Sequence, residues 1–195
     1  GYEIRFVGGK VSRKWVAGAS VQGSAGPVHL HAEGHLSARD RDSNGQLDPQ
    51  PWGGKLAAGP SISWPWKNLS VGVEYAYLSE GGATPADYLQ VQAEQSPDAL
   101  PYLGRHYLSA FVGADLIPVL NLSAIGLVNA VDGSGISGVS LKYNAADEVD
   151  VILGAFAPWG APASTPDPLT PSFVQIGSEF GDAPLTVYVE TRAFF

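Results

Sequence analysis

The stretch "PLTVYVETRAFF" (residues 184–195) alternates between two kinds of side chain. A β-strand turns successive side chains to opposite faces, so a period of two predicts a strand with two different surroundings. One face is apolar apart from a threonine, and the other carries charged and aromatic groups: Leu185, Val187, Val189, Thr191, Ala193 and Phe195 against Tyr188, Glu190, Arg192 and Phe194. The stretch therefore predicts a strand that separates an apolar environment from a polar one.

The same alternation recurs along the chain. In "LSVGVEYAY" (69–77) leucine, valines and tyrosines fall on one face, and serine, glycine, glutamate and alanine fall on the other. We expect about ten strands, each close to the ~10 residues that a tilted strand needs to cross a bilayer. Their predicted spans are 2–8, 13–23, 27–39, 53–64, 68–79, 104–116, 119–131, 136–144, 147–158 and 183–195.

The connections between these segments are of two kinds. Short connections lie at 24–27, 65–68, 117–118 and 144–147, and the long ones lie at 40–52, 80–103 and 159–182. With ten strands in up-and-down order, every long connection lies at one end and both termini lie at the other. This asymmetry is typical of outer-membrane barrels. We therefore predict an all-β, transmembrane, antiparallel up-and-down barrel that forms one domain over residues 1–195.

Aromatic residues gather near both predicted strand ends. Those near the short turns are Trp64, Trp66, Tyr143 and Phe195, and those near the long loops are Trp15, Tyr75, Tyr77 and Trp159. Two belts of amphipathic rings are what the two interfaces of a membrane select. The alternative interpretation is a soluble β-sandwich or lipocalin-like barrel, whose apolar faces would point inward.

Composition excludes several classes of function. The chain has 195 residues, a net charge of −8 and no cysteine. Nucleic acid is not an expected partner, because phosphate binding needs clustered Lys and Arg. A disulfide framework and thiolate chemistry are excluded by the lack of cysteine. No apolar run approaches the ~18 residues of a transmembrane helix. Without an initiator Met or a signal peptide, we expect a mature or trimmed chain.

The tail resembles a known class of protein. "YVETRAFF" (188–195), together with "VSLKYNAADEVDVILGAF" (139–156), resembles Gram-negative outer-membrane β-barrels, including proteobacterial barrels with no assigned activity. The resemblance implies a place in the bacterial outer membrane with both termini periplasmic. It also implies contact with outer-membrane lipids and lipopolysaccharide, and with the barrel-assembly machinery through Phe195. The first predicted strand, "YEIRFVG" (2–8), is short, which leaves open that this is the C-terminal part of a larger barrel.

Three of the four histidines lie on one face of the predicted strand 27–39. His29, His31 and His35 share that face with Glu33, and in a barrel they would point into the lumen. A His-x-His pair can contribute two ligands to zinc, which takes three or four. A strand, however, holds its ligands in a row and supplies only one side of a coordination shell. We therefore predict that this histidine stripe is lumen wall without tightly bound metal.

The loop that follows carries a more specific pattern. "DRDSNGQLD" (40–48) resembles the first nine positions of an EF-hand calcium loop. The predicted ligands are Asp40, Asp42, Asn44, Gln46 (through its carbonyl) and Asp48. Gly45 would permit the sharp turn that wraps these oxygens around a cation. Pro51 stands where the family has a bidentate Glu, so we predict weak Ca²⁺ binding, with a solvated acidic turn as the alternative.

Two further features lie in the predicted long loop 80–103 and at its borders. "TPADYLQVQAEQ" (84–95) has Thr84 as an N-cap and Pro85 at the first helical position, which predicts a short helix. His106, Ser79 and Asp87 lie at the same rim and are the candidates for a hydrolase site. Their spacing in the sequence does not indicate a catalytic triad. Triads are recognised by the geometry of their side chains and not by their order along the chain.

These features lead to one function and two alternatives. We expect a barrel with a narrow, charge-lined lumen, because ten strands enclose little more space than the eight that side chains fill. The expected role is a structural or accessory envelope protein that presents external loops to a protein partner. The alternatives are a pore for small solutes and, with less support, a hydrolase at the rim.

Overall fold

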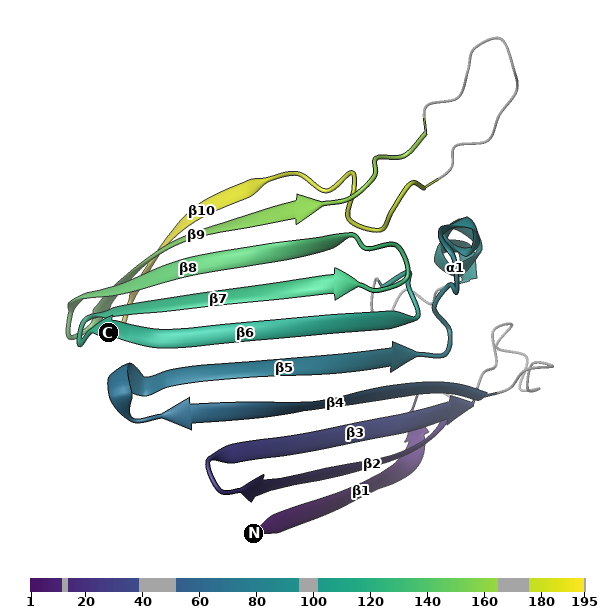
Figure 1. Ribbon diagram of the computed structural model, residues 1–195, viewed down its shortest axis with the longest axis horizontal. Helices are drawn as coiled ribbons and strands as arrows, with labels where there is room; N and C mark the ends of the chain where they lie inside the picture. Colours follow the sequence, from purple (N-terminus) through teal and green to yellow (C-terminus); the bar gives the residue numbers. More distant parts are fainter. Residues whose placement is uncertain (12–13, 39–51, 95–101, 165–175, 195) are drawn as a thin grey trace.

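A computed structural model describes residues 1–11, 14–38, 52–94, 102–164 and 176–194. Ten strands form one antiparallel sheet in chain order (Figure 1). The strands are β1 (Tyr2–Val11), β2 (Lys14–Ala25), β3 (Val28–Ala38), β4 (Trp52–Trp64), β5 (Leu69–Leu78), β6 (His106–Ile117), β7 (Leu120–Asn129), β8 (Gly135–Ala146), β9 (Val149–Trp159) and β10 (Thr186–Ala193). The predicted all-β, up-and-down order of ten strands is confirmed.

The two ends of the sheet differ as predicted. The connections β2–β3, β4–β5, β6–β7 and β8–β9 lie at one end, together with the start of β1 and the end of β10 (Figure 1). The other five connections lie at the opposite end, called the loop end below. Most strand bounds lie within two residues of the prediction, and two differ by three residues. β1 runs for ten residues instead of seven, because it pairs with β2 along its whole length, and β10 begins only at Thr186.

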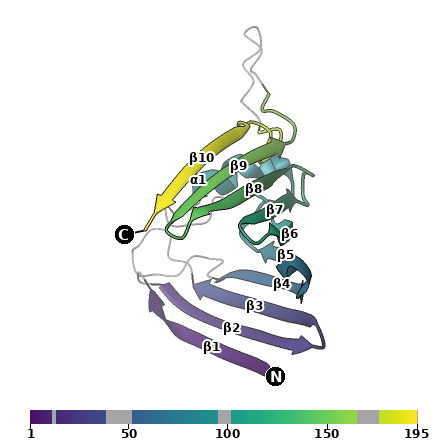
Figure 2. The same ribbon diagram turned by 90° about the vertical axis from the view of Figure 1, so that its left-hand side faces the viewer.

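The sheet is strongly curved and open. Figure 2 shows it as a trough, with β1 and β10 as its two free edges. Within the described residues each of these strands pairs on one side only, β1 with β2 and β10 with β9. Both edges expose large apolar side chains, including Phe6 at 81 % and Val189 at 70 %. Closure of the barrel is therefore not part of the observed fold.

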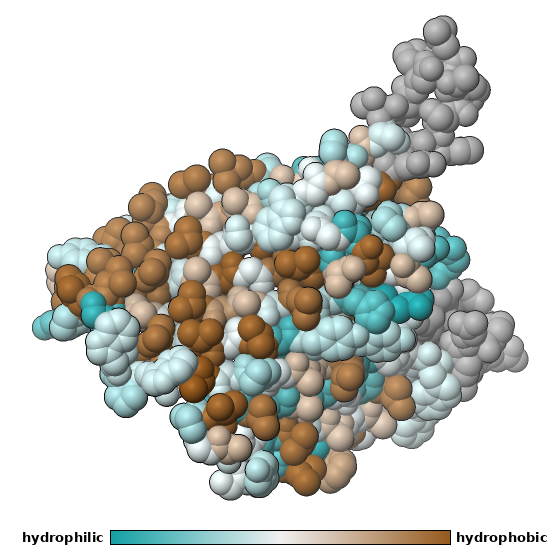
Figure 3. All heavy atoms as spheres, in the orientation of Figure 1, coloured by the Kyte–Doolittle hydropathy of each residue, from teal (hydrophilic) through white to brown (hydrophobic). Residues whose placement is uncertain are grey.

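The register sorts side chains between the two faces of the trough. Partners on the convex face run from Ile4 across the sheet through Val21, Ala32, Ala58 and Tyr75. The neighbouring row, on the concave face, runs from Arg5 through Ser20, Glu33, Ala57 and Ala76. Figure 3 shows apolar side chains covering the convex side of the strands. The described residues bury only five apolar side chains: Ala38, Leu78, Tyr88, Tyr107 and Ile152.

Aromatic rings cover glycines on neighbouring strands. A Cβ built at Gly72 would collide with the ring of Phe111, its direct partner on β6. The same relation holds for four other direct cross-strand pairs: Gly23 with Tyr2, Gly135 with Trp159, Gly138 with Phe156 and Gly154 with Tyr188. Each ring fills the space above a residue without a side chain, which restores packing that glycine alone would lose.

The predicted short helix is present in the β5–β6 connection. A 3₁₀ turn, η2 (Pro85–Asp87), leads into α1 (Tyr88–Glu94). Asp87 Oδ2 accepts hydrogen bonds from the backbone N–H of Thr84 (2.9 Å) and Ala83 (3.0 Å), so it caps the start of the turn. A second 3₁₀ turn, η1 (Trp66–Asn68), joins β4 to β5. None of the described helices has the length and apolar character to span a membrane.

Candidate functional site

The concave face carries most of the charged groups of the strands, and most of these are paired. Ion pairs join Arg5 to Glu3, Lys142 to Asp150 and Arg192 to Glu190, with N···O distances of 2.6, 2.8 and 2.6 Å. All six residues lie on this face by register. On the open sheet the side chains of the Arg5–Glu3 and Arg192–Glu190 pairs are 43–69 % exposed, so these pairs contribute little to stability there.

The histidine stripe belongs to this paired surface. His31 Nε2 lies 2.7 Å from Glu74 Oε2, although the two residues belong to β3 and β5. Gly59 of β4 lies between the two strands and has no side chain, which leaves room for the contact. His29 Nδ1 lies 2.7 Å from Ser24 Oγ. Among the described residues no group of three or more His, Asp or Glu is placed to hold a metal.

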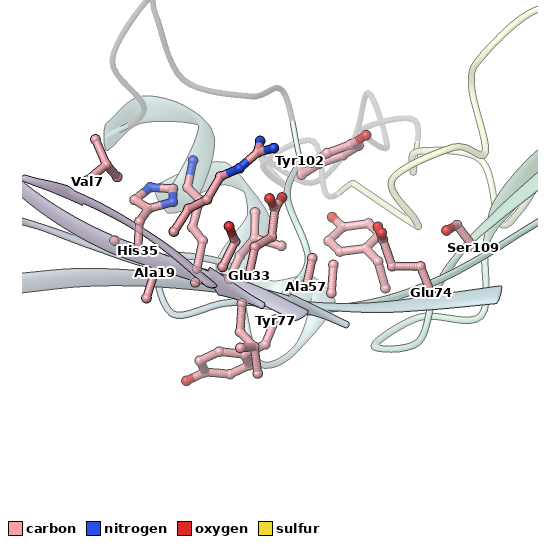
Figure 4. A pocket seen from close by; sticks show the side chains of 18 of the residues that line it. Val7, Ala19, Glu33, His35, Ala57, Glu74, Tyr77, Tyr102 and Ser109 are labelled. Atoms are coloured by element: carbon pink, nitrogen blue, oxygen red, sulfur yellow. The ribbon is translucent and has the colours of Figure 1, made fainter. Parts of the chain in front are cut away.

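Three charged or titratable groups on the concave face make no such pair. In the part of the chain that the structure describes, no hydrogen bond or ion pair engages the side chains of Glu33, His35 and Lys55. His35 lies directly opposite Lys55, and Glu33 lies two residues along β3. All three line a cavity of about 660 Å³ on the concave side (Figure 4).

Small residues form the floor of this cavity and larger ones form its wall. Gly18, Ser20, Ala57 and Ala76 leave the sheet bare between the charged groups. Val7, Leu78 and Leu127 contribute apolar surface. Tyr102 and Tyr107 stand at the loop end of the cavity, with ring centroids 4.8 Å apart. Figure 4 shows Tyr102, Glu33, His35 and Glu74 on the cavity side of the sheet and Tyr77 on the other. The site combines unpaired charges with apolar and aromatic walls.

A buried polar network occupies the loop end beside the cavity. Its centre is Asn129, fully buried at the end of β7. The Asn129 amide donates hydrogen bonds to the Tyr88 hydroxyl (2.8 Å) and to Glu179 Oε2 (2.7 Å). Asn129 Oδ1 accepts from the backbone N–H of Val131 (2.9 Å). A Cβ at Gly104 would collide with this amide, so glycine there permits the contact. The network joins α1, β7 and the β9–β10 connection.

Glu179 is a carboxylate in this network without a cationic partner among the described residues. It accepts hydrogen bonds from the Tyr107 hydroxyl (2.5 Å) and the backbone N–H of Leu103 (3.1 Å), besides that of Asn129. Burial raises the pKa of Glu179 above its ordinary value, although these hydrogen bonds act to lower it. Burial therefore makes the charged form of Glu179 less favourable than it would be in water.

Asp132, the second carboxylate, is held differently. It accepts hydrogen bonds from the Tyr88 hydroxyl (2.9 Å) and from the backbone N–H groups of Glu179 (2.9 Å) and Ser134 (2.7 Å). Burial acts to raise the pKa of Asp132, but hydrogen bonds from Ser134, the Glu179 backbone and Tyr88 hold it below the ordinary value. Burial raises the pKa of Tyr88, and its bond to Asp132 adds to the effect. Together these groups join the described parts of the β5–β6, β7–β8 and β9–β10 connections.

The residues proposed for a hydrolase each have separate partners. His106 Nδ1 lies 2.7 Å from the Tyr75 hydroxyl on the convex face. Ser79 Oγ accepts a hydrogen bond from the backbone N–H of Gly54 (2.7 Å), and Asp87 caps η2. The hydrogen bonds described for these three side chains do not join them to one another.

The predicted calcium ligands and the predicted sorting residue lie outside the described residues. The calcium ligands are Asp40, Asp42, Asn44, Gln46 and Asp48, and the sorting residue is Phe195. Sequence analysis missed the network of Tyr88, Tyr107, Asn129, Asp132 and Glu179. The one signal for it was the run "NAVDGSG" (129–135), whose Asn, Asp and Gly favour a tight turn with side-chain hydrogen bonds to backbone.

No protein-family model matches this chain, and no curated protein does.

Proposed function

We propose that the chain forms a β-barrel of a bacterial outer membrane, with a narrow, charge-lined lumen and a structural or accessory role in the envelope. The observation that carries the proposal is the sorting of side chains between the two faces. Burying a leucine gains about 1.5–3 kcal/mol, so a soluble protein would cover such residues. Leu30, Leu108 and Leu153 on the convex face remain 47 %, 52 % and 49 % exposed. Lipid chains are the surroundings that fit this face.

The positions of the tryptophans support a membrane-spanning sheet. The four tryptophans in strands lie on the convex face by register, and each stands at or beside a strand end: Trp15, Trp52 and Trp159 at the loop end and Trp64 at the other. The strand between Trp52 and Trp64 is about 40 Å long at ~3.3 Å per residue. A tilt of about 40° projects this to roughly 30 Å, the thickness of a bilayer core.

The two free edges carry charges that fit each other. Glu3 and Arg5 lie on the concave side of β1, and Glu190 and Arg192 lie on the concave side of β10. In an antiparallel pairing of β1 with β10, the register that sets Arg5 opposite Glu190 also sets Glu3 opposite Arg192. A shift of two residues in either direction places like charges opposite each other, which is destabilising. We propose that the barrel closes in this register.

The stagger of the strands agrees with closure. The line of direct partners that starts at Ile4 ends at Trp159, passing through Val21, Ala32, Ala58, Tyr75, Leu108, Val128 and Gly135. Trp159 lies beyond Phe156, the partner of Thr186 at the start of β10. A line of direct partners perpendicular to the strands therefore reaches β9 at a point beyond the first residue of β10, so β10 contributes no residue to it. Barrels need such a stagger because their strands tilt, and no backbone edge can stay unpaired in lipid.

The loop end is the surface offered to partners. The buried network ties the described parts of the β5–β6, β7–β8 and β9–β10 connections together, so these parts are held in a defined arrangement. Such an arrangement suits recognition by another envelope protein, while lipopolysaccharide would surround the rim. The sequence 40–48, with its proposed Ca²⁺ ligands, belongs to the connection between β3 and β4, outside the described residues.

Two measurements test the membrane barrel. Refolded protein should migrate differently on a gel before and after boiling, because a closed barrel resists detergent until heated. Tryptophan fluorescence in vesicles should be quenched by lipids brominated near the headgroup more than by lipids brominated near the bilayer centre. Identical migration together with unquenched fluorescence would contradict the proposal and favour a soluble fold.

A pore for small solutes is the second candidate, and the cavity of about 660 Å³ on the concave face favours it. A lumen of ten strands leaves little more than a constricted path. Conductance of the purified protein in a planar bilayer separates the two functions. Stable channels would favour the pore, whereas a silent bilayer with folded protein would favour the structural role.

A further inference from the structure

The unpaired charges of the concave face gather in one place. Elsewhere on this face the described strand charges have partners, as in Arg5 with Glu3, or Lys142 with Asp150. Glu33, His35 and Lys55 are the exception, and all three line the same cavity (Figure 4). A barrel that pairs its charges everywhere else gains nothing from leaving this group unpaired, unless a ligand supplies the missing partners.

The charges of the group determine the chemistry of that ligand. Lys55 and His35 lie opposite each other and present N–H donors, which suit an anionic group. Glu33 lies two residues from His35 along β3, a distance of about 7 Å, and suits a cationic group. An anion alone would leave Glu33 unpaired, and a cation alone would leave Lys55 unpaired. The group therefore fits a molecule that carries both charges.

The remaining wall adds an apolar requirement. Leu78, Leu127 and the ring pair of Tyr102 and Tyr107 face the same cavity. Aromatic rings and leucines bind apolar groups by excluding water from both surfaces. The small residues of the floor, such as Ala57, leave the space that such a group would occupy. A charged solute without an apolar part would leave these apolar side chains in contact with water.

We propose that the cavity binds a small zwitterion with an apolar side chain, namely an amino acid or a short peptide. Its carboxylate lies against Lys55 and His35, its ammonium group against Glu33, and its side chain against Leu78 and the Tyr102 ring. This inference rests on the proposed barrel, because the concave face must be the lumen for the cavity to be enclosed. It adds to the structural role a solute that the lumen recognises.

Calorimetry on the refolded full chain in detergent tests the proposal. The probes are phenylalanine, the dipeptide alanylphenylalanine, N-acetylphenylalanine (anion only) and phenylalaninamide (cation only). We expect one or both zwitterions to bind at least tenfold more tightly than either singly charged analogue, since each analogue lacks one charged hydrogen-bonding partner. The tighter of the two zwitterions identifies the source as free amino acid or peptide. Failure of both zwitterions to bind more tightly than N-acetylphenylalanine and phenylalaninamide would overturn the proposal.

Charge exchange distinguishes a binding role from a merely structural one. Glu33→Lys and Lys55→Glu should each abolish zwitterion binding, whereas the double exchange should restore it with the ligand reversed. Lys142→Gln, which breaks an ion pair elsewhere on the concave face, is the matched control and should bind normally. Failure of the double exchange to rescue binding would contradict the assignment. Heat-dependent gel migration of the same samples separates this failure from failure of the barrel itself.

Discussion

Asn129 is the residue whose loss should loosen the loop end most. Its side chain donates hydrogen bonds to the Tyr88 hydroxyl and Glu179 Oε2, and accepts one from the Val131 N–H. Asn129→Ala leaves these buried groups without a partner. A neutral hydrogen bond contributes about 1 kcal/mol, and one to a charged group about 1.5–3 kcal/mol. We expect the network to lose about 3 kcal/mol, which is roughly a hundredfold in its opening equilibrium.

Hydrogen exchange measures this opening directly. The backbone N–H groups of Leu103 and Glu179 donate to carboxylates of the network, so their exchange reports on it. In Asn129→Ala we expect their exchange to accelerate by about a hundredfold, while amides in the middle of β2 keep their protection. Asn121→Ala is the matched control, because Asn121 bonds to Asp115 at the opposite end of the sheet. Unchanged exchange at Leu103 and Glu179 in Asn129→Ala would refute the role assigned to the network.

Three further predictions concern pH, closure and calcium. The pKa of Glu179 is raised in the folded protein, so its contribution to stability is complete below its ordinary pKa and is lost as pH rises through the folded value. Hydrogen exchange of the loop-end amides, corrected for intrinsic rates, should therefore become faster as pH rises through that range. Glu179→Gln should remove this pH dependence. Because the chain has no cysteine, Phe6→Cys with Val189→Cys should form an intramolecular disulfide in the proposed register. Preferential cross-linking of Phe6→Cys with Thr191→Cys, or between molecules, would contradict that register. Calorimetry should give a Ca²⁺ Kd of about 10⁻⁴ to 10⁻³ M that is lost in Asp42→Ala, and equal heats in both proteins would reject the site.

The strands were predictable because one rule generates them. Alternation over 69–77 places β5 within a residue of its observed bounds, since each face of the sheet has a constant environment. The predicted segment 119–131 alternates less regularly than the other segments, and this has a physical cause. Ile125 and Leu127 of β7 lie on the concave face, beside Phe111 and the cavity. This part of the concave face is apolar, so the two faces of β7 do not differ in polarity as those of other strands do. Pairing with β6 and β8 on both sides forms the strand regardless.

The site was less accessible to sequence reasoning. The side chains of Glu33, His35 and Lys55 could be assigned to one face, but not their lack of partners, because pairing depends on which strands lie beside β3. The loop-end network is harder still to predict, since Asn129 and Glu179 lie 50 residues apart in the chain. No local period brings such residues together. In both cases the sequence pattern of a single strand does not say which strands are neighbours or in which register they pair.

The positions of glycines nevertheless indicate part of the register between neighbouring strands. Along the β8–β9 pair, one register sets Gly138 opposite Phe156 and also sets Gly135 opposite Trp159. A shift of two residues would separate both pairs at once, and it would set the Phe156 ring opposite Ile136 or Ser140 instead of a glycine. Two coincidences in one hairpin thus select a single register without any knowledge of the fold. The aromatic–glycine pairs therefore indicate the alignment of the hairpin in which they lie, before the rest of the sheet is known.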